Sequence, residues 1–278
     1  MTVLAVLNLK GGVGKTTAAV HLAHLQARAG RPTLLWDLDP QGAASWCFRV
    51  QPREDAPPKE LLGDREVLWA AIRGSDWPPL DVLPADLSLR KLENALRRDP
   101  APVETFQATL TELGRRYERI LLDCPPGLSL LSECVFHAAD ALLVPTIPSA
   151  LSLRTLAALH AHVKTHRRRG LLVLPFFSMV DARKAQHRSV RDFARANELG
   201  FLATEIPLSA QVESAAARRE PLTVAETRGP AAAFAALARE IDGHLAARKD
   251  APRLQRKRLE DLVLGAQRAA RGDTRGAS

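Results

Sequence analysis

Eight consecutive residues near the start of the chain have the types and order needed to hold phosphate groups: Lys10-Gly11-Gly12-Val13-Gly14-Lys15-Thr16-Thr17. Glycines allow several backbone N–H groups to converge on one anion, and the first turn of a following helix adds its partial positive charge. Lys15 can reach the β- and γ-phosphates of a nucleotide, and the Thr16 hydroxyl is suited to Mg²⁺. The run therefore predicts a phosphate-binding loop.

This loop departs from two common glycine-rich patterns. A dinucleotide-binding loop needs a third glycine, but Gly12-Val13-Gly14 is followed by Lys15, so the dinucleotide alternative fails. The ordinary nucleotide-binding pattern G-x-x-x-x-G-K-[ST] begins with glycine, whereas this chain has Leu9 at that place. A lysine, Lys10, instead precedes the paired glycines, and it distinguishes this loop from the ordinary one.

Carboxylates follow two further apolar runs. Asp37 and Asp39 lie in the sequence WDLDPQG, and Asp123 lies in LLDCPPG. In a parallel sheet the carboxyl ends of the strands meet at one edge, which is also where the phosphate loop belongs. A single aspartate after a strand is usually a helix cap or a turn residue. Three that converge on a phosphate loop favour the handling of a metal ion and of water.

These residues need a scaffold that alternates short buried strands with helices. The apolar runs predict strands at Val3–Leu7, Thr33–Trp36, Leu80–Leu83, Ile120–Leu122, Ala141–Val144, Leu171–Phe177 and Phe201–Ile206. Helical periodicity predicts helices at Lys15–Ala29 and at about 102–117, 151–167, 185–199 and 230–247. We therefore expect an α/β fold in which a mainly parallel, twisted sheet has helices on both faces.

The distribution of charge and proline suggests one domain with a tail. We predict a single domain over residues 1–247, in which the proline-rich segment 51–79 is an irregular insertion. Residues 248–278 should form a basic, partly helical tail, since they hold 9 Lys or Arg against 4 Asp or Glu. The net charge of +8 is therefore concentrated at one end and does not by itself establish binding to nucleic acid.

Composition narrows the class of protein. Hydrophobic residues make up 46% and charged residues 25%, which is ordinary for a globular chain. The longest apolar runs are too short to span a bilayer, and we expect no signal peptide. The three cysteines have spacings that fit neither a disulfide framework nor a zinc site. A cytoplasmic location is expected.

The motifs together resemble the ParA/MinD family of deviant-Walker ATPases, and the ParA branch most. The resemblance is carried by KGGVGKTT at 10–17, DLDPQG at 37–42 and LLDCPPGLSLL at 121–131, and weaker similarity continues over roughly residues 1–247. It implies a P-loop NTPase fold, ATP and Mg²⁺ as cofactors, ATP hydrolysis, and a homodimer that forms on ATP.

The resemblance also implies roles for the catalytic and metal-binding residues. Lys15 would serve the phosphates, and Lys10 would reach the nucleotide of the partner subunit. Asp39 would help to position the attacking water. Three residues would serve the Mg²⁺ and its water shell: Thr16, Asp37 and Asp123.

Further cofactor contacts follow from the same resemblance. Gly11 and Gly12 would let two backbones approach closely, and Val13, Gly14 and Thr17 complete the loop. The adenine pocket would lie around Ser178–Met179 and Pro207–Val212, with Met179 and Pro207 as contacts.

DNA and an adaptor protein are the partners that the resemblance implies. ParA relatives bind DNA without sequence preference in their ATP-bound dimer, so association with the nucleoid is expected, together with a ParB-like adaptor that stimulates hydrolysis. Arg183 stands in the stretch MVDAR, where the family commonly has a DNA-binding arginine. Leu208 and Gln211 replace two arginines that are frequent in the family. The contact should therefore fall to Arg183 with Arg218 and Arg219. Lys184 with Arg188, the run Lys164–Arg169 and the basic tail are further candidates.

Other functions remain open at this point. A MinD-like positioning ATPase would cycle on a membrane, but the basic tail contains no Trp, Phe or Tyr, so membrane contact is not expected. A metabolic P-loop enzyme, similar to the cobyrinic acid and dethiobiotin synthetases, needs no lysine at the place of Lys10. An electron carrier like nitrogenase reductase would need two suitably placed cysteines in each subunit, and Cys124 directly follows Asp123.

Overall fold

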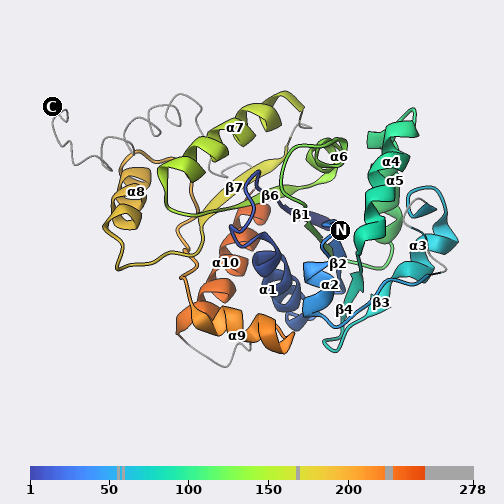
Figure 1. The fold of residues 1–278 in the computed structure, drawn as a ribbon, viewed down its shortest axis with the longest axis horizontal. Helices are drawn as coiled ribbons and strands as arrows, with labels where there is room; N and C mark the ends of the chain where they lie inside the picture. The colour runs from blue at the N-terminus through green and yellow to red at the C-terminus, as the bar shows by residue number, and fades with distance from the viewer. Residues whose placement is uncertain (55–56, 58–59, 167–169, 223–227, 248–278) are drawn as a thin grey trace.

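The computed structural model describes residues 1–54, 57, 60–166, 170–222 and 228–247, so the predicted tail at 248–278 lies outside the described residues. A seven-stranded sheet forms the centre of the molecule, with the strand order β3-β4-β2-β5-β1-β6-β7 (Figure 1). All neighbouring strands are parallel except β3 and β4. The predicted mainly parallel sheet is therefore confirmed. The strands are β1 (Thr2–Val6), β2 (Thr33–Asp37), β3 (Arg73–Gly74), β4 (Leu80–Leu83), β5 (Arg119–Asp123), β6 (Ala141–Thr146) and β7 (Leu172–Phe177).

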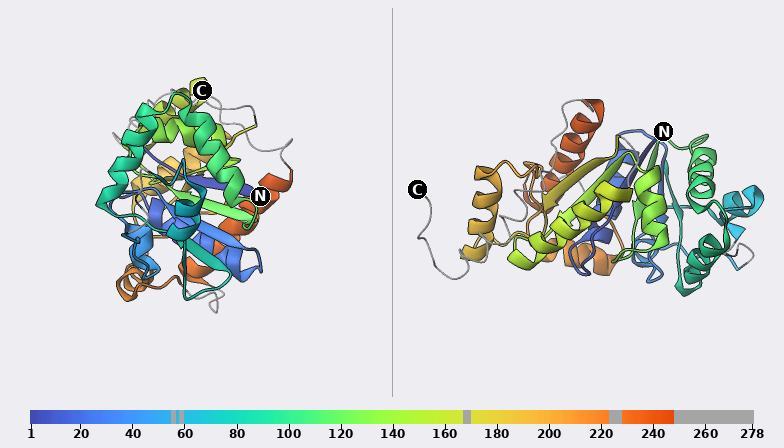
Figure 2. Two further views of the ribbon diagram at one scale, coloured as in Figure 1. Left: turned by 90° about the vertical axis from the view of Figure 1, so that its right-hand side faces the viewer. Right: turned by 90° about the horizontal axis from the view of Figure 1, so that it is seen from above.

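Helices cover both faces of this sheet, as predicted (Figure 2). Alternate side chains of each strand point to opposite faces, and two separate apolar clusters result. One face packs against α3 (Arg65–Ala71), α4 (Arg90–Arg98), α5 (Pro102–Leu113), α6 (Leu130–Ala138), α7 (Ala150–His166) and α8 (Ala185–Ala196). The other face packs against α1 (Lys15–Arg28), α2 (Ala43–Cys47), α9 (Ala210–Arg218) and α10 (Gly229–Ala246).

The strand register brings the chemically important strand ends together. In the sheet β5 lies between β2 and β1, so that Asp123 at the end of β5 has Asp37 as its Cα partner on one side and Val6 on the other. Neighbouring strands are about 4.8 Å apart. Asp123 therefore ends beside the segment that follows β1, and Asp37 ends one strand further from it.

The strand predicted at Phe201–Ile206 is wrong. Leu202 and Ile206 do donate backbone hydrogen bonds to β7, but the N–H groups between them turn the other way. Ala203 N and Thr204 N donate to the carboxylate of Glu240 on α10, at 2.6 and 2.9 Å. This side chain takes the donors that a continuous ladder would need, and only a bridge between Val180 and Pro207 remains.

Within the segment 51–79, predicted to be an irregular insertion, residues 60–79 contain a helix and a strand. The helix is α3, whose first turn is capped by the Asp64 carboxylate, which accepts hydrogen bonds from Glu66 N and Val67 N. The strand is β3, which pairs with β4 in the antiparallel direction and extends the edge of the sheet.

All three cysteines are free thiols, of which Cys124 and Cys134 are buried and Cys47 is half-buried. Within the described part of the chain, none of the helices has both the length and the apolar character that crossing a membrane requires.

Candidate functional site

The segment after β1 forms a loop that ends at the first turn of α1. Gly12 and Gly14 have φ angles of 68° and 88°, a backbone region that favours glycine, and Gly14 is the N-cap of α1. A loop of this shape, followed at once by a helix N-terminus, presents backbone donors to an anion. The predicted phosphate loop therefore has the conformation that its sequence requires.

Two buried polar side chains fix the shape of the loop. Asn8 accepts a hydrogen bond from Lys10 N at 3.0 Å through Oδ1, and its Nδ2 donates to Pro145 O at 2.8 Å. Ser178, at the end of β7, donates its hydroxyl to Val13 O at 2.7 Å. The loop is thus held by the ends of β6 and β7 without any contribution from a ligand.

Lys15 brings a buried positive charge to this loop. Its side chain lies inside, with 7% of the residue exposed, and its Nζ donates to Lys10 O at 3.3 Å. Burial lowers the pKa of Lys15, while the carboxylates of Asp123 and Asp39 oppose that shift. An ammonium group has three donors, so the group can also donate to phosphate oxygens.

Asp123 is the least satisfied charged group of the site. It is fully buried, and within the described residues neither carboxylate oxygen accepts a hydrogen bond of good geometry, although the Thr16 hydroxyl lies close enough to favour its charged form. Burial holds its pKa well above the usual range, and the charge of Asp37 adds to this rise, whereas Thr16 and Lys15 oppose it. A buried, unpartnered carboxylate is costly unless a cation or its water shell satisfies it. The arrangement therefore fits a Mg²⁺ ion between Asp123 and Thr16.

Asp37 is equally buried but is well supported. Its Oδ2 accepts hydrogen bonds from Ser45 N at 2.9 Å and from Ser45 Oγ at 2.8 Å, and its Oδ1 accepts from Asp39 N at 3.2 Å. Burial raises the pKa of Asp37 to about 6. Asp37 thus ties the end of β2 to α2, and it is placed to hold a water of a metal ion next to Asp123.

Asp39 lies further out than the other two carboxylates. It is half-buried, and its Oδ1 accepts a hydrogen bond from Gln41 N at 3.0 Å. The turn that carries it is fixed by Gly42, whose φ is 63° and where a Cβ would lie 2.6 Å from Ala85 O. Asp39 therefore lies at the solvent side of the site, where its carboxylate can contact a water molecule.

A cavity of about 140 Å³ opens beside the loop. Both predicted adenine contacts, Met179 and Pro207, line it together with Gly14 and Thr17. Most of its wall is apolar, from side chains such as Phe176, Ile206, Val212 and Phe234. An aromatic base joined to a phosphate chain would fit this combination of apolar wall and phosphate loop.

The predicted DNA-binding arginines form two groups. Arg218 and Arg219 end α9 beside α2, where the Arg219 guanidinium lies 4.1 Å from the centre of the Trp46 ring. Arg49, which sequence analysis did not single out, joins them because it pairs with Glu220 at 2.8 Å and donates to Arg218 O at 3.1 Å. The arginine cluster is therefore Arg49, Arg218 and Arg219.

Arg183 lies apart from this cluster, in the loop before α8. Figure 1 draws α8 at the left edge of the molecule, away from α2. The Arg183 side chain is 87% exposed, and it makes a two-pronged ion pair with Asp181 at 2.9 and 3.0 Å. The three predicted arginines therefore do not form one patch within a single chain.

Two residues of the site were missed by sequence analysis. Asn8 fixes the loop, and Ser45 supports Asp37 while its hydroxyl also accepts from Ala85 N at 2.9 Å. Small polar residues of this kind are common in any chain, and no spacing marks them. Their roles depend on segments that only the fold brings together.

The unpartnered charge of Asp123 leads to a prediction about stability. In a Mg²⁺-free buffer at pH 7.5, Asp123→Asn should raise the melting temperature, since leaving a buried charge without a partner costs about 1–3 kcal/mol or more. That gain corresponds to at least about 2–4 °C for a domain of this size. The gain should shrink toward pH 5. A carboxyl whose pKa is raised by folding favours the folded state at low pH, and this stabilisation is lost as the pH rises through the folded pKa.

Thermal unfolding of both chains at the two pH values, with and without Mg²⁺, measures this effect. Asp192→Asn, at an exposed position on α8, is the matched control and should change little. Addition of Mg²⁺ should stabilise the wild-type chain more than the Asp123→Asn variant. A lower melting temperature of the variant at pH 7.5 would contradict the assignment of an unsatisfied charge.

Comparison with known proteins agrees with this geometry. A family model described as "AAA domain" matches residues 1–172. The chromosome partitioning protein ParA of Caulobacter vibrioides is 37% identical over 149 residues, which are 52% of this chain and 55% of that protein. An uncharacterized protein of Mycobacterium tuberculosis is 32% identical over 252 residues, 86% of this chain and 78% of that one. The match spans only about half the length of the first curated relatives.

A solved structure extends the similarity to most of the chain. The crystal structure of cobyrinic acid a,c-diamide synthase from Mycobacterium smegmatis, with bound ADP and magnesium, is 28% identical and has a TM-score of 0.74. It covers 92% of this chain and 100% of its own. With the loop, the carboxylates and the sheet order already described, these matches identify the family. The chain belongs to the AAA-domain family, in its ParA/MinD group of P-loop ATPases.

Proposed function

We propose that this chain is a Mg²⁺-dependent ATPase that dimerises on ATP and positions DNA or another large cargo. One observation above all supports the proposal. The unpartnered Asp123 carboxylate lies fully buried at the phosphate loop that Lys15 and Thr16 complete. Mg²⁺ and a nucleoside triphosphate would satisfy both the carboxylate and the donors of the loop.

The residues of the site divide the work of hydrolysis. Backbone N–H groups from Gly12 to Thr16, with Lys15, hold the β- and γ-phosphates. Thr16, Asp37 and Asp123 would hold Mg²⁺ and its water shell, and a bound ion would supply positive charge next to the phosphates. Asp39 accepts a hydrogen bond from the attacking water and orients it in line with the leaving oxygen.

The second subunit supplies the remaining positive charge. Gly11 and Gly12 are exposed, and a Cβ at either position would have no heavy atom within 4 Å, so this part of the loop is open to close approach. Lys10 of the facing subunit reaches the phosphates there and stabilises the charge that develops in the transition state. Dimerisation is therefore coupled to the presence of ATP, and hydrolysis releases it.

DNA is the proposed matrix, and a ParB-like adaptor is the proposed activator. The arginine cluster and Arg183 are two separate positively charged regions of each subunit, so a dimer would present four of them. Binding through phosphate contacts needs no base sequence and weakens steeply with salt. The pairing of Arg183 with Asp181 leaves Nη1 of the guanidinium without a bond to that carboxylate, and so available for a DNA phosphate.

DNA binding by charge-reversal variants tests this proposal. Arg183→Glu is expected to lower the salt slope of binding by about 2 per dimer, because each subunit loses about one phosphate contact. The matched control is Arg97→Glu on α4, since Arg97 is also an exposed arginine in an ion pair, 2.8 Å from Glu93. ATP-driven dimerisation, followed by light scattering, should stay the same in both variants.

The same assay includes Arg218→Glu and a chain shortened by residues 248–278. If all these chains bind DNA as the wild type does, the DNA proposal fails. Pelleting with anionic vesicles in place of DNA then tests the membrane-cycling alternative.

A second candidate follows from the similarity to the cobyrinic acid a,c-diamide synthase, which is an amidation enzyme by its name. Such an enzyme would consume ATP in the presence of a carboxylic acid substrate and an amine donor, and would need neither DNA nor Lys10. The two candidates are separated by one measurement. ATP hydrolysis that rises with DNA and an adaptor favours positioning, and hydrolysis that rises with a corrinoid acid and glutamine favours amidation.

A further inference from the structure

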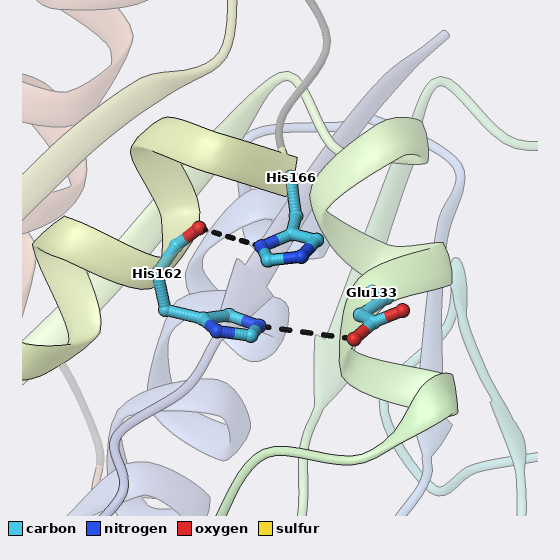
Figure 3. A group of neighbouring side chains, drawn as sticks. All are labelled: Glu133, His162 and His166. Carbon is cyan, nitrogen blue, oxygen red and sulfur yellow. Dashed lines mark hydrogen bonds and ion pairs between the residues drawn. The ribbon is translucent and has the colours of Figure 1, made fainter.

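We propose that Glu133, His162 and His166 form a site for a transition-metal ion of the Zn²⁺ type, separate from the Mg²⁺ site. The three side chains meet between α6 and α7 (Figure 3). One ligand atom from each lies within 4.8 Å of the others. Tetrahedral Zn²⁺ with bonds of about 2.0–2.1 Å holds its ligands about 3.4 Å apart, so side-chain rotations must shorten the distances between the ligand atoms by up to about 1.4 Å.

A hydrogen bond to the backbone holds the His166 imidazole in a tautomer that can bind a metal ion. Its Nδ1 lies 3.0 Å from His162 O, one helical turn earlier on α7. The carbonyl can only accept, so Nδ1 carries the proton and the other ring nitrogen, Nε2, has a free lone pair. Metal-binding histidines are typically oriented by a hydrogen bond of this kind to a backbone carbonyl.

His162 supplies the second nitrogen. Its Nε2 is buried, and within the described residues it has no hydrogen-bond partner. The nearest carboxylate oxygen, Glu133 Oε1, is 3.9 Å away, which is too far for a hydrogen bond but suitable for two ligands of one ion. A polar nitrogen without a partner and a carboxylate that face each other thus leave a place for a cation.

Packing holds His162, whereas His166 must turn. The rings of His162 and His166 stack with centroids 4.1 Å apart and 22° between their planes, so His166 has to rotate out of the stack before the lone pairs of both rings meet at one ion. Phe136, buried on α6, meets the edge of His162 at 5.9 Å. Because α6 and α7 are anchored in the core beneath these residues, the ligands come from rigid elements rather than from loops.

The ligand set selects the kind of metal. Two imidazoles and one carboxylate suit Zn²⁺ and its neighbours, whereas Mg²⁺ prefers oxygen ligands. His162 Nε2 is buried, but the Glu133 side chain is 38% exposed, so an ion can enter from the side of Glu133 and a water can complete the tetrahedron. A bound ion would join α6 to α7.

An ion pair between a protonated His162 and Glu133 is the competing interpretation. It would need only these two residues, and His166 would be dispensable. The metal site needs all three. The two interpretations therefore differ in what His166→Ala does.

Titration of the full chain without a histidine tag, using Co²⁺ and Zn²⁺ in excess Mg²⁺, tests the proposal. Co²⁺ should give the intense visible absorption of a tetrahedral site, without a thiolate-to-cobalt band, and Zn²⁺ should displace it. Removal of an outer-shell partner typically costs 10–100-fold in affinity, and loss of a ligand in His162→Ala or His166→Ala should cost at least about 100-fold. Zn²⁺ should raise the melting temperature of the wild-type chain but not of these variants.

Three further chains make the outcome decisive. Glu133→Gln, which changes the side chain least, should weaken binding while the metal-free melting temperature stays the same. His244→Ala, on α10 at the opposite face of the sheet, and Asp123→Asn should both bind as the wild type does. Equal binding by the wild type and His166→Ala, or loss of binding in Asp123→Asn, would overturn the proposal.

Discussion

Replacement of Lys15 by alanine should weaken ATP binding at least about 100-fold. Lys15 is the buried cation of the phosphate loop, and its ammonium faces Asp123 and Asp39. Two charge-assisted hydrogen bonds to phosphate oxygens are worth about 1.5–3 kcal/mol each, and about 1.4 kcal/mol corresponds to a factor of ten. Without the lysine, the triphosphate would also meet the buried carboxylates of the site with no positive side chain of its own subunit between them.

Binding of a fluorescent ATP analogue in the presence of Mg²⁺ measures this loss. Lys91→Ala, at an exposed position on α4, is the matched control and should bind the analogue as the wild type does. The loop itself should survive the substitution, because Asn8 still binds Lys10 N and Ser178 still binds Val13 O, and only the hydrogen bond from Lys15 Nζ to Lys10 O is lost. Wild-type affinity in the Lys15→Ala chain would overturn the assignment of the nucleotide site.

Local sequence predicted the centre of this site well because its geometry is local. Runs of four and five buried residues make β1 and β2, and the glycines after β1 permit the positive φ angles of the turn into α1. Once the strands are parallel, Asp37 and Asp123 must share one edge of the sheet, and their pairing in register follows. Each of these steps uses residues close together in the chain, or the single assumption of a parallel sheet.

The features that were missed depend on contacts between distant segments. Glu240 on α10 interrupts the predicted last strand because it binds Ala203 N and Thr204 N. The residue types near position 203 do not indicate this contact. Ser45 binds Asp37 and also accepts a hydrogen bond from Ala85 N, which lies 40 residues further along the chain. The cluster between α6 and α7 shows the same limit. The spacing of His162 and His166 places them on one helical face, but nothing in the sequence adds Glu133 to them.

Replacement of Lys10 by alanine should leave ATP binding nearly intact and lower ATP hydrolysis at least about 100-fold. Both backbone groups of Lys10 are engaged, since its N–H donates to Asn8 Oδ1 and its carbonyl accepts from Lys15 Nζ. A change confined to the side chain therefore spares the loop. A cation supplied by a facing subunit stabilises the charge of the transition state more than that of bound ATP, and such groups are worth about 10³–10⁵ in rate. Steady-state phosphate release, measured beside analogue binding, gives both quantities.

Mixing two inactive variants tests whether Lys10 acts across the dimer. In Asp39→Ala the attacking water loses its positioning partner while Lys10 remains, and in Lys10→Ala the reverse holds. When the two chains pair, the nucleotide of the Lys10→Ala subunit keeps its own Asp39 and receives Lys10 from the other subunit. Random pairing makes half of the dimers mixed with one complete site each, so activity should return to at most about a quarter of the wild-type rate. If Lys10 served the nucleotide of its own subunit, every site in the mixture would lack one group. A mixture as inactive as its components would therefore refute the action across the dimer.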